Sequence, residues 1–457
     1  METLDKLTQA TRGSEYEGQL YLVGGIVRDK VMGLPAQQDI DIVLEGDAKA
    51  LANFLHSKGV GEHVPVVFPT FGTAMISVNG DQVEIVCSRA ETYDPNSRKP
   101  EVRAASLRED ALRRDFTINT LMENLHTGEV IDPLGVARRD LELRIIRTPT
   151  DPRVTFSEDP LRMLRAVRFA ARFDFAIEPE TYRAIESEAG RLSIVSNERV
   201  RDELTKILIS PGAARGLELL RESGLLAQFA PELVTTHGVT QNVYHIYDCW
   251  THTMKVLEAL PEDASLLLRL AALFHDVGKP ATRSVDDNGN VHFYSHQIVG
   301  ADITRKIMHR LRFSNDETDY VVRMVQMHLR VGEYDSEWSD AAVRRLIRDA
   351  GPMLEDLITL TGADKSASNL DMPSVDLEQF RFRMERAQVG LKVAEIRSPL
   401  DGCEIMALLN VPGGPLLRQA KDFLVNEVIE GRLRLEDKEE ASRLLLREFG
   451  GRQDAGG

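Results

Sequence analysis

The chain has 457 residues, of which 42% are hydrophobic, so it is long enough for two to four domains with buried cores. It contains no apolar run of the roughly 18 residues that a transmembrane helix needs, so we expect no membrane association. The polar segment 1–18 lacks the apolar core of a signal peptide. Three widely spaced cysteines argue against disulfides and against a cysteine zinc site, which predicts a cytoplasmic location.

The formal net charge of −16 argues at first sight against a nucleic-acid-binding protein. Phosphate contacts, however, need only a local basic surface. Between Arg98 and Arg172 there are 15 Lys and Arg against 12 Asp and Glu, so basic residues gather in one stretch. Solvated helix faces produce the same pattern, so charge alone leaves both interpretations open.

The first 147 residues predict an α+β region with a small sheet, and the rest of the chain is helical. Strands are predicted at 19–23, 39–44, 74–78 and 82–87, with helices at 26–32 and 47–58. Prolines between 149 and 160 mark the change to helices. Further helices are predicted at 158–173, 179–189, 197–209, 212–222, 245–260, 264–275, 295–311, 315–330 and 339–350. The segment 281–294 predicts a loop or hairpin, the tail from about 375 is helical, and 451–457 is expected to be frayed.

A glycine pair follows the first predicted strand, in LYLVGGIVRD. Gly24 and Gly25 let the backbone turn tightly, and the free N–H groups of the helix that starts there can hold an anion. Arg28 lies in the first turn of that helix, where it can clamp a phosphate. A turn of this kind is by itself weak support for a phosphate site.

Three carboxylates fall on predicted strands. Asp39 and Asp41 flank Ile40, so both project from one face, and Glu84 lies on another strand in QVEIV. Neighbouring carboxylates repel unless they are solvated or neutralised by a divalent cation. A polar sheet face and a two-metal site, which would activate a hydroxyl and stabilise leaving pyrophosphate, are both consistent with this pattern.

Arginines follow in two clusters. Arg113 and Arg114, in LRRDFTIN, can hold a triphosphate or a ribose, although such a pair is more often surface charge. The segment from Glu158 begins a helix, and Asp159 suits its N-terminus as a cap. Asp159 can also face the same ligand as an arginine three residues on. The basic residues of this helix recur every three positions: Arg162, Arg165 and Arg168.

Most of the 11 histidines lie in the middle of the chain. A lone histidine is more often a core residue, but a His-Asp pair with several further histidines and an acid is better explained by a metal ion. Imidazole and carboxylate ligands suit Mn, Fe, Ni, Zn or Mg with open positions for water. The residues concerned are His245, His252, His275, Asp276, His296, His328 and Asp364.

The order and spacing of LVGGIVRD, DIDIV, VEIV, RRDFTIN, EDPLRMLRAVRFAARF and NERVRDEL resemble the class II tRNA nucleotidyltransferase and bacterial poly(A) polymerase family over residues 19–210. WTHT, LFHDVGK and TGADK resemble the HD phosphohydrolase superfamily over 243–370. The resemblance implies an α+β fold class with four parts. These are a small mixed-sheet, polymerase-β-like nucleotidyltransferase head (1–147), an all-α neck and body (148–235), an HD domain (236–372) and a helical tail (373–457).

In the head and neck, the resemblance implies that Asp39 and Asp41 bind two catalytic Mg²⁺ ions and that Glu84, an Asp in many relatives, is the third acid. It implies that Asp159 and Arg162 read the incoming base in place of a template. A carboxylate accepts from the amino groups of cytosine and adenine, whereas uracil and guanine present a carbonyl oxygen there. The remaining residues implied to contact the nucleotide, its triphosphate or the RNA end are Gly24, Gly25, Arg28, Arg113, Arg114, Arg165 and Arg168.

In the HD domain, the resemblance implies metal ligands for Mg²⁺ or a divalent transition metal. Four of them form the core of the motif: His252, His275, Asp276 and Asp364. Members with two metals place extra ligands where His296 and His328 stand in this chain.

The implied function is addition of CCA, or part of it, to tRNA 3′ ends from CTP and ATP, with a second, phosphohydrolase activity. The loop 89–112 is close to full length, which favours an enzyme able to add A. Alternatives are a poly(A) polymerase, a partial CC-adding or A-adding enzyme, an HD hydrolase with a regulatory nucleotide-binding head, and a structural RNA-binding protein. The intact acids and Arg28 disfavour an inactive head, and the acidic total charge disfavours the last alternative. The oligomeric state, monomer or homodimer, stays open.

Overall fold

The computed structural model describes all residues except 1, 36–38, 69–71, 93–100, 389–395 and 451–457. The chain forms two compact units, one spanning Met1–Val234 with Arg310–Arg312 and the other spanning Thr235–His309 with Phe313–Gly457. No helix within the described ranges is long and apolar enough to cross a membrane. The four-part division at 147, 235 and 372 stays a prediction, and the expected fraying of 451–457 lies outside the described residues.

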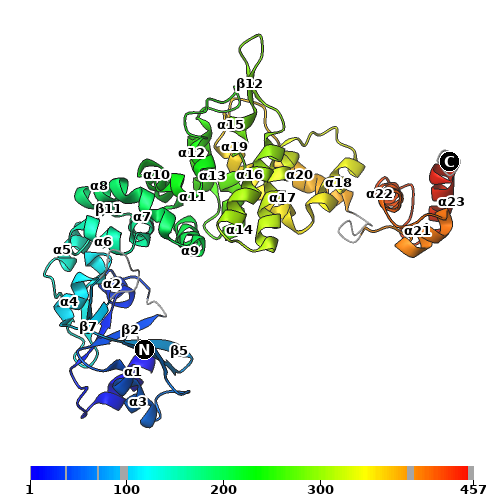
Figure 1. The fold of residues 1–457 in the computed structure, drawn as a ribbon. Coiled ribbons are helices and arrows are strands. Elements are labelled where there is room, and N and C mark those ends of the chain that lie inside the picture. The colour runs from blue at the N-terminus through cyan, green and yellow to red at the C-terminus, as the bar shows by residue number, and fades with distance from the viewer. Residues whose placement is uncertain (1, 36–38, 69–71, 93–100, 389–395, 451–457) are drawn as a thin grey trace. The chain divides into compact units, whose positions relative to one another are not determined.

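A seven-stranded mixed sheet forms the head of the first unit (Figure 1). Its strands, in spatial order, are β3 (Val66–Phe68), β4 (Thr73–Val78), β5 (Asp81–Cys87), β2 (Ile40–Leu44), β1 (Leu20–Val23), β8 (Met122–Asn124) and β9 (Val130–Ile131). The β2–β5 pair is parallel and the other pairs are antiparallel, which confirms the predicted mixed sheet. A hairpin of β6 (Arg89–Thr92) and β7 (Glu101–Ala104) lies outside this sheet.

The two faces of this sheet have different surroundings because side chains alternate along each strand. On one face, the cross-strand row of Ile42, Ile85 and Ala74 is fully buried, and α3 (Ala48–Ser57) packs against β4 and β5. The helix α1 (Glu2–Thr11) lies against α3. On the other face, Asp41 and Glu84 occupy the equivalent row, so the acids face away from this core.

Part of the acid-bearing face is covered by α4 (Leu107–Leu112). Its Ala111 packs with Val23 and Val43 in a buried cluster over the β1 and β2 side. The remaining elements of the unit are α2 (Gly25–Val31), η2 (Thr117–Asn119), α5 (Ala137–Glu142), β10 (Ile145–Ile146), α6 (Pro152–Glu158), α7 (Leu161–Phe173), β11 (Ala176–Ile177), α8 (Pro179–Glu188), η3 (Ala189–Ile194), α9 (Asn197–Leu208), α10 (Ala213–Glu222), α11 (Leu226–Phe229) and α12 (Pro231–Val234).

The predicted helix 158–173 corresponds to α7 but starts three residues too early, and a separate helix, α6, precedes it. Glu158 ends α6, and Asp159 has extended backbone angles (φ −139°, ψ 99°) before Pro160 and α7. A proline disfavours helical geometry in the preceding residue, which explains the break at Asp159. The missed helix α6 begins at Pro152 and is capped by Asp151, whose side chain accepts a hydrogen bond from the Arg153 N–H at 2.8 Å.

The second unit is helical apart from one hairpin. Its elements are α13 (Cys249–Ala259), α14 (Leu266–Phe274), α15 (Lys279–Thr282), β12 (Arg283–Val285), β13 (Val291–Phe293), α16 (His296–Arg310), α17 (Asn315–Gly332), α18 (Asp340–Ala350), η4 (Gly351–Met353), α19 (Leu354–Ser366), α20 (Leu377–Ala387), α21 (Gly402–Leu409), α22 (Pro415–Ile429) and α23 (Lys438–Phe449). Helix α13 starts four residues later than the predicted helix 245–260, because the Asp248 side chain caps it by accepting from the Thr251 N–H. No helix was predicted at α19, which carries Asp364.

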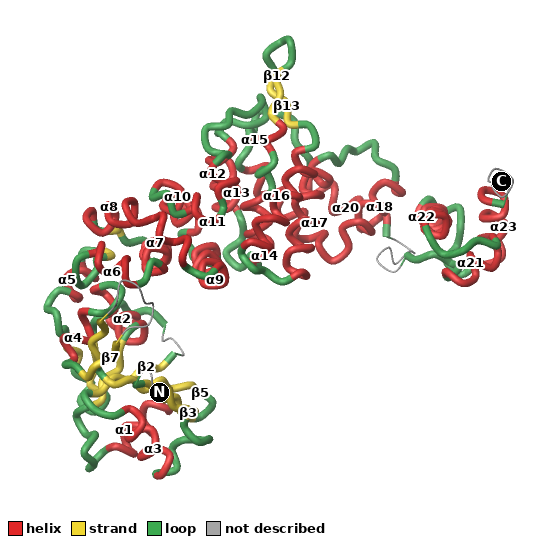
Figure 2. Tube along the Cα trace, in the orientation of Figure 1, coloured by secondary structure: helices red, strands yellow, loops and turns green. Residues whose placement is uncertain are grey.

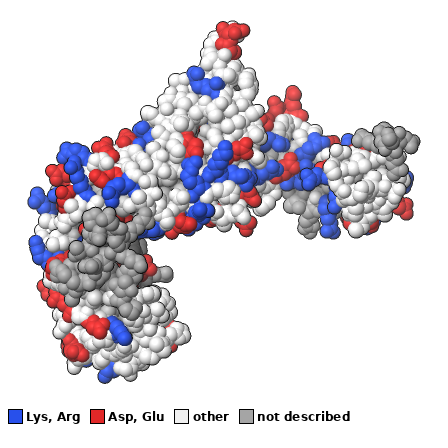
Figure 3. Space-filling model, in the orientation of Figure 1, with Lys and Arg blue, Asp and Glu red and all other residues white. Residues whose placement is uncertain are grey.

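The β12–β13 pair confirms the hairpin alternative for 281–294 (Figure 2). Asp286 organises its turn by accepting hydrogen bonds from the Asn290 N–H at 2.8 Å and from His292 Nε2 at 3.1 Å. Acidic side chains gather at the tip of this projection (Figure 3). Exposed charge of this kind opposes edge-to-edge pairing with another chain.

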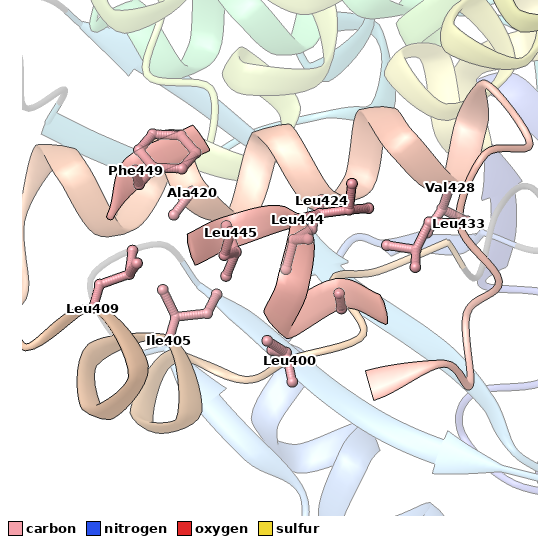
Figure 4. Close-up of a cluster of buried hydrophobic side chains, with 11 residues drawn as sticks. Leu400, Ile405, Leu409, Ala420, Leu424, Val428, Leu433, Leu444, Leu445 and Phe449 are labelled. Carbon is pink, nitrogen blue, oxygen red and sulfur yellow. The ribbon is translucent and has the colours of Figure 1, made fainter. Parts of the chain in front are cut away.

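The last three helices form a small hydrophobic core of their own, in line with the predicted helical tail. Ile405 from α21, Leu424 from α22 and Leu445 from α23 are fully buried in it (Figure 4). Phe423 and Phe449 add an edge-to-face contact at 5.6 Å between ring centroids. The tail therefore has enough buried apolar surface to hold its three helices together.

A substitution at Gly278 tests the packing around the start of α16. A Cβ at this position would meet the backbone carbonyl of His296 and would lie 2.6 Å from the Gly300 nitrogen, so Gly278→Ala forces two backbone segments apart. We expect a loss of about 1–3 kcal/mol of unfolding free energy. Gly332→Ala is the control, because its added Cβ would come no closer than 3.9 Å to a neighbour. Urea unfolding followed by the fluorescence of Trp250 and Trp338 measures both, and equal midpoints would contradict this packing account.

Two candidate active sites

The three predicted acids come together at one edge of β2. Asp41 on β2 is the register partner of Glu84 on the parallel strand β5, and Asp39 stands exposed just before β2. Burial is the main reason that the pKa of Asp41 is raised to about 6, and the negative charges of Glu84 and Asp39 add to it. Arg114 opposes this shift. The site thus gathers more negative charge than its protein neighbours neutralise, which suits a divalent cation.

The glycine turn lies directly against these acids. Gly24 has φ 76°, which favours glycine, and a Cβ there would be 3.7 Å from both Arg114 Nη1 and Asp41 Oδ2. Gly25 begins α2. Arg113 and Arg114 are both held by the buried Asp110, whose carboxylate accepts from their Nε atoms at 2.9 and 3.2 Å. The turn, one acid and one arginine are therefore neighbours, and a charged arginine beside a glycine turn suits a phosphate.

Arg28 lies in a buried network. Its side chain is 2% exposed, and it donates from Nε to Asp29 at 2.7 Å and from Nη1 to Asn119 at 2.6 Å. The guanidinium also lies over the rings of Phe173 and Phe169, at 4.7 and 5.1 Å from their centroids. In this arrangement Arg28 braces α2 against α7, and the triphosphate role implied by the resemblance stays a prediction.

Asp159 and Arg162 lie where α6 meets α7 and have partners of their own. Asp159 accepts from the Leu161 N–H at 3.1 Å and from Arg199 Nη2 at 3.0 Å. Arg162 donates from Nη2 to the Arg113 carbonyl at 2.8 Å. Asp159 thus accepts from the first backbone N–H of α7 and from Arg199 in this arrangement, and its role in reading the base stays a prediction. Arg199 was not singled out in the sequence, although it belongs to the NERVRDEL motif.

Arg165 and Arg168 are each paired with a buried acid. Arg165 Nε donates to Asp115 at 2.8 Å, and Arg168 Nε lies 3.2 Å from Glu203. Burial disfavours the charge on Asp115, but Arg165 and the Asn119 amide outweigh it and lower the pKa of Asp115 to about 2. Burial lowers the pKa of Arg168 to about 10. Two acids that sequence analysis left without a role, Asp115 and Glu203, thus hold the basic face of α7 in place.

The second candidate site lies in the other unit, where six predicted ligands converge. They form two groups whose ligand atoms lie within 4.8 Å of one another, namely His252, His275 and Asp364, and Asp276, His296 and His328. Asp276 faces both groups. Its Oδ2 lies 3.1 Å from His275 Nε2, and its Oδ1 lies 3.4 Å from His296 Nε2. One carboxylate is thus placed between two clusters of potential ligands.

Backbone carbonyls fix the imidazole rings of this site. The Nδ1 atoms of His275, His296 and His328 lie 2.7–2.8 Å from the carbonyls of residues 272, 293 and 325. A carbonyl only accepts, so each Nδ1 carries the hydrogen and a neutral ring presents the lone pair of Nε2. Burial lowers the pKa of His328 to about 3, which keeps that ring neutral.

Three buried polar atoms of this site, His252 Nε2, His275 Nε2 and Asp276 Oδ2, make no well-directed hydrogen bond among the described residues. Their nearest partners are ionic: Asp364 Oδ1 lies 2.9 Å from His252 Nε2, and Lys279 Nζ lies 2.6 Å from Asp276 Oδ2. Unsatisfied donors and acceptors in a protein interior are costly. Imidazole nitrogens and carboxylate oxygens converging in this way fit a divalent metal ion, which would satisfy them.

Two further residues lie beside the histidine cluster. Lys279 Nζ, which is buried, lies 2.6 Å from Asp276 Oδ2 and 3.4 Å from His245 Nε2. Burial and the charge of Lys279 lower the pKa of His245 to about 3. Sequence analysis noted His245 without a role and did not consider Lys279, although the spacing HDVGK gives the signal for it.

Comparison with known families matches three segments of the chain. The family described as Poly A polymerase head domain matches residues 20–147. The family described as probable RNA and SrmB-binding site of polymerase A matches residues 174–235, and the HD domain family matches residues 242–368. The first two matches cover the acid site and the helices beyond it, and the third covers the histidine cluster.

Relatives that match more than two thirds of the chain agree with these family matches. The A-adding tRNA nucleotidyltransferase of Deinococcus radiodurans is 38% identical over 324 residues, which cover 68% of this chain and 72% of the relative. The CC-adding tRNA nucleotidyltransferase of Thermus thermophilus is 36% identical over 358 residues, covering 76% and 79%. The solved structure of the Bacillus stearothermophilus CCA-adding enzyme with CTP has a TM-score of 0.69 at 25% identity, covering 98% of this chain and 96% of that one.

The fold and the acid site define a nucleotidyltransferase of the polymerase-β type, and the predicted fold class and enzyme class are confirmed. The chain belongs to the tRNA nucleotidyltransferase and poly(A) polymerase family.

The pKa of Asp41 gives a prediction for stability. Because its pKa is about 6 in the folded protein and ordinarily 3.8, the ionised carboxylate destabilises the metal-free fold fully above pH 6 and not below about 3.8. Asp41→Asn should therefore stabilise the metal-free protein at pH 7 by about 1–3 kcal/mol. This gain in stability should shrink towards pH 4.5. Asp39→Asn, which changes an exposed residue, should give a smaller gain in stability at pH 7. Thermal unfolding in EDTA by circular dichroism measures these differences, and a wild type as stable as Asp41→Asn at pH 7 would contradict the assignment.

Proposed function

We propose that this enzyme adds C and A nucleotides, CCA or its terminal part, to tRNA 3′ ends without a template, from CTP and ATP with release of pyrophosphate. The observation that carries the proposal is the convergence of Asp41, Glu84 and Asp39 against the glycine turn and Arg114. Mg²⁺ held by these acids would supply charge neutralisation at the reacting phosphate. Three free cysteines agree with work in the cytoplasm.

Two observations support a proposal about which nucleotides the enzyme adds. The relatives named above add A or CC, and a third, the multifunctional CCA protein of Cupriavidus necator, is 35% identical over 347 residues. The segment between Glu84 and Arg113 contains a β6–β7 hairpin and α4, in keeping with the full-length loop that favours A addition. We therefore propose that ATP is a substrate whether or not CTP is one. tRNA ending at the discriminator base, at C or at CC, incubated with each NTP and sequenced, tests this, and failure of all three to gain A would contradict it.

We propose a second activity, metal-dependent phosphoester hydrolysis, for the histidine cluster. The unsatisfied Nε2 atoms of His252 and His275 and the central position of Asp276 support it, because they form a ready-made ligand set. By family resemblance the substrate is a 2′,3′-cyclic phosphate. His252, His275, Asp276 and Asp364, with His296 and His328, are the proposed ligands.

Independence of the two sites is testable. Asp276→Asn should abolish hydrolysis of a 2′,3′-cyclic nucleotide in Mg²⁺, Mn²⁺, Ni²⁺ or Co²⁺, because it removes one negative charge between the two ligand groups. Addition to tRNA should stay within about twofold of wild type, since the acids that carry it lie in the other unit. His309→Ala, which changes an exposed histidine of α16, is the control and should leave both activities intact. Absence of hydrolysis by wild type with all four metals would refute the second activity.

Base selection by Asp159 and Arg162 is the finer part of the proposal. When a nucleotide is bound, Asp159 accepts from its exocyclic amino group, so Asp159→Ala should lower kcat/KM for CTP and ATP by about tenfold to hundredfold and narrow the gap to UTP and GTP. Asp159→Asn is the matched control, because its amide oxygen still caps the Leu161 N–H while its NH₂ group donates to a carbonyl. That variant should shift preference towards UTP and GTP. Unchanged ratios for all four NTPs in both variants would show that Asp159 is only a cap.

A further inference from the structure

The edge strand of the head sheet carries unusually exposed apolar side chains. Val66 and Phe68 on β3 are 55% and 40% exposed, and Val64 just before the strand is 76% exposed. Val67, between them, pairs with Ala74 on the buried side of the sheet. Exposed apolar side chains grouped on one face are typical of a surface that binds a ligand or partner.

Cross-strand register places this apolar surface in line with the acids. Val66 pairs with Met75, Met75 pairs with Glu84, and Glu84 pairs with Asp41, so all four occupy one row on one face of the sheet. Adjacent strands lie about 4.8 Å apart, so Val66 is about 10 Å from Glu84 and about 14 Å from Asp41. The apolar surface therefore lies next to the acid site on the same face of the sheet.

The geometry of nucleotidyl transfer indicates from which side of the acids the RNA approaches. The glycine turn, Arg114 and α4 lie on the β1 side of Asp41, and α4 covers the sheet there through Ala111. An attacking oxygen must approach roughly in line with, and opposite to, the leaving pyrophosphate. If the triphosphate lies on the β1 side, the RNA 3′-OH reaches the acids from the side of β5, β4 and β3.

We propose that the surface formed by Val64, Val66, Phe68 and Met75 docks the last bases of the RNA 3′ end, an inference that rests on the proposed addition to tRNA. The row is long enough for two or three nucleotides beyond the reacting one. Apolar and aromatic side chains contact the face of any base and do not read its edge. Such a surface accepts either the discriminator base or C at the end of the primer, as an enzyme that extends its own product requires.

The test is the double variant Val66→Ala and Phe68→Ala with tRNA ending in CC. Loss of base contacts should raise the KM for tRNA about 5- to 100-fold, while the KM for ATP stays within twofold. Leu143→Ala is the matched control, because Leu143 is also exposed and apolar (52%) but lies just after α5, away from the β3 edge. A primer with an abasic penultimate nucleotide gives a second measurement. It should bind wild type as weakly as the double variant and show little difference between them.

Each outcome is decisive. An unchanged KM for tRNA in a double variant that still extends it overturns the docking surface and leaves the proposed addition intact. If the KM for tRNA is unchanged but light scattering shows that the double variant differs from wild type in oligomeric state, then β3 contacts another copy of the chain. If wild type extends no RNA at all, the proposed function itself fails and the docking surface fails with it.

Discussion

The repulsion between Asp41 and Glu84 is the constraint around which the head is built. Burial is the largest cause of the raised pKa of Asp41, and parallel pairing of β2 and β5 adds the charge of Glu84 beside it. Among the described residues, Arg114 is the one that opposes this shift of the Asp41 pKa. The fold therefore keeps a local excess of negative charge that a divalent cation relieves, at the cost of stability in the metal-free protein.

The surrounding ionic network keeps the remaining charges in fixed places. Asp110 holds the two arginines beside the acids, and Asp115 holds Arg165 on α7. Asn119 contacts both Asp115 and Arg28. These two residues in turn contact Arg165, Phe169 and Phe173 of α7, so the network joins the head to that helix. Buried pairs of this kind contribute more to a unique arrangement than to net stability. In the histidine cluster, backbone carbonyls take this part by orienting the rings of His275, His296 and His328.

Sequence analysis predicted the parts that depend on local pattern. Alternation of Asp39 and Asp41 predicted a shared face, and the histidine spacing predicted a cluster that the structure brings together. Other features have no local signal. The partners of Arg168 and Arg165 lie 35 and 50 residues away in the chain, so only the folded chain brings Glu203 and Asp115 to them.

One misjudged helix start has a local cause. Glu158 and Asp159 suit a helix N-terminus and predicted a start at 158, whereas Glu158 ends α6 and α7 begins after Pro160. The aromatic surroundings of Arg28 had no local signal, because Phe169 and Phe173 lie over its guanidinium only in the folded chain. Burial of a particular side chain depends on which helix packs against it, and periodicity does not carry that information.

The most direct test of the acid site is a crystal structure of the protein with CTP and Mn²⁺, recorded at a wavelength where manganese scatters anomalously. The account predicts anomalous density between the carboxylates of Asp39, Asp41 and Glu84, next to the triphosphate of CTP. Bound CTP with its triphosphate elsewhere, and no manganese at these carboxylates, would contradict it.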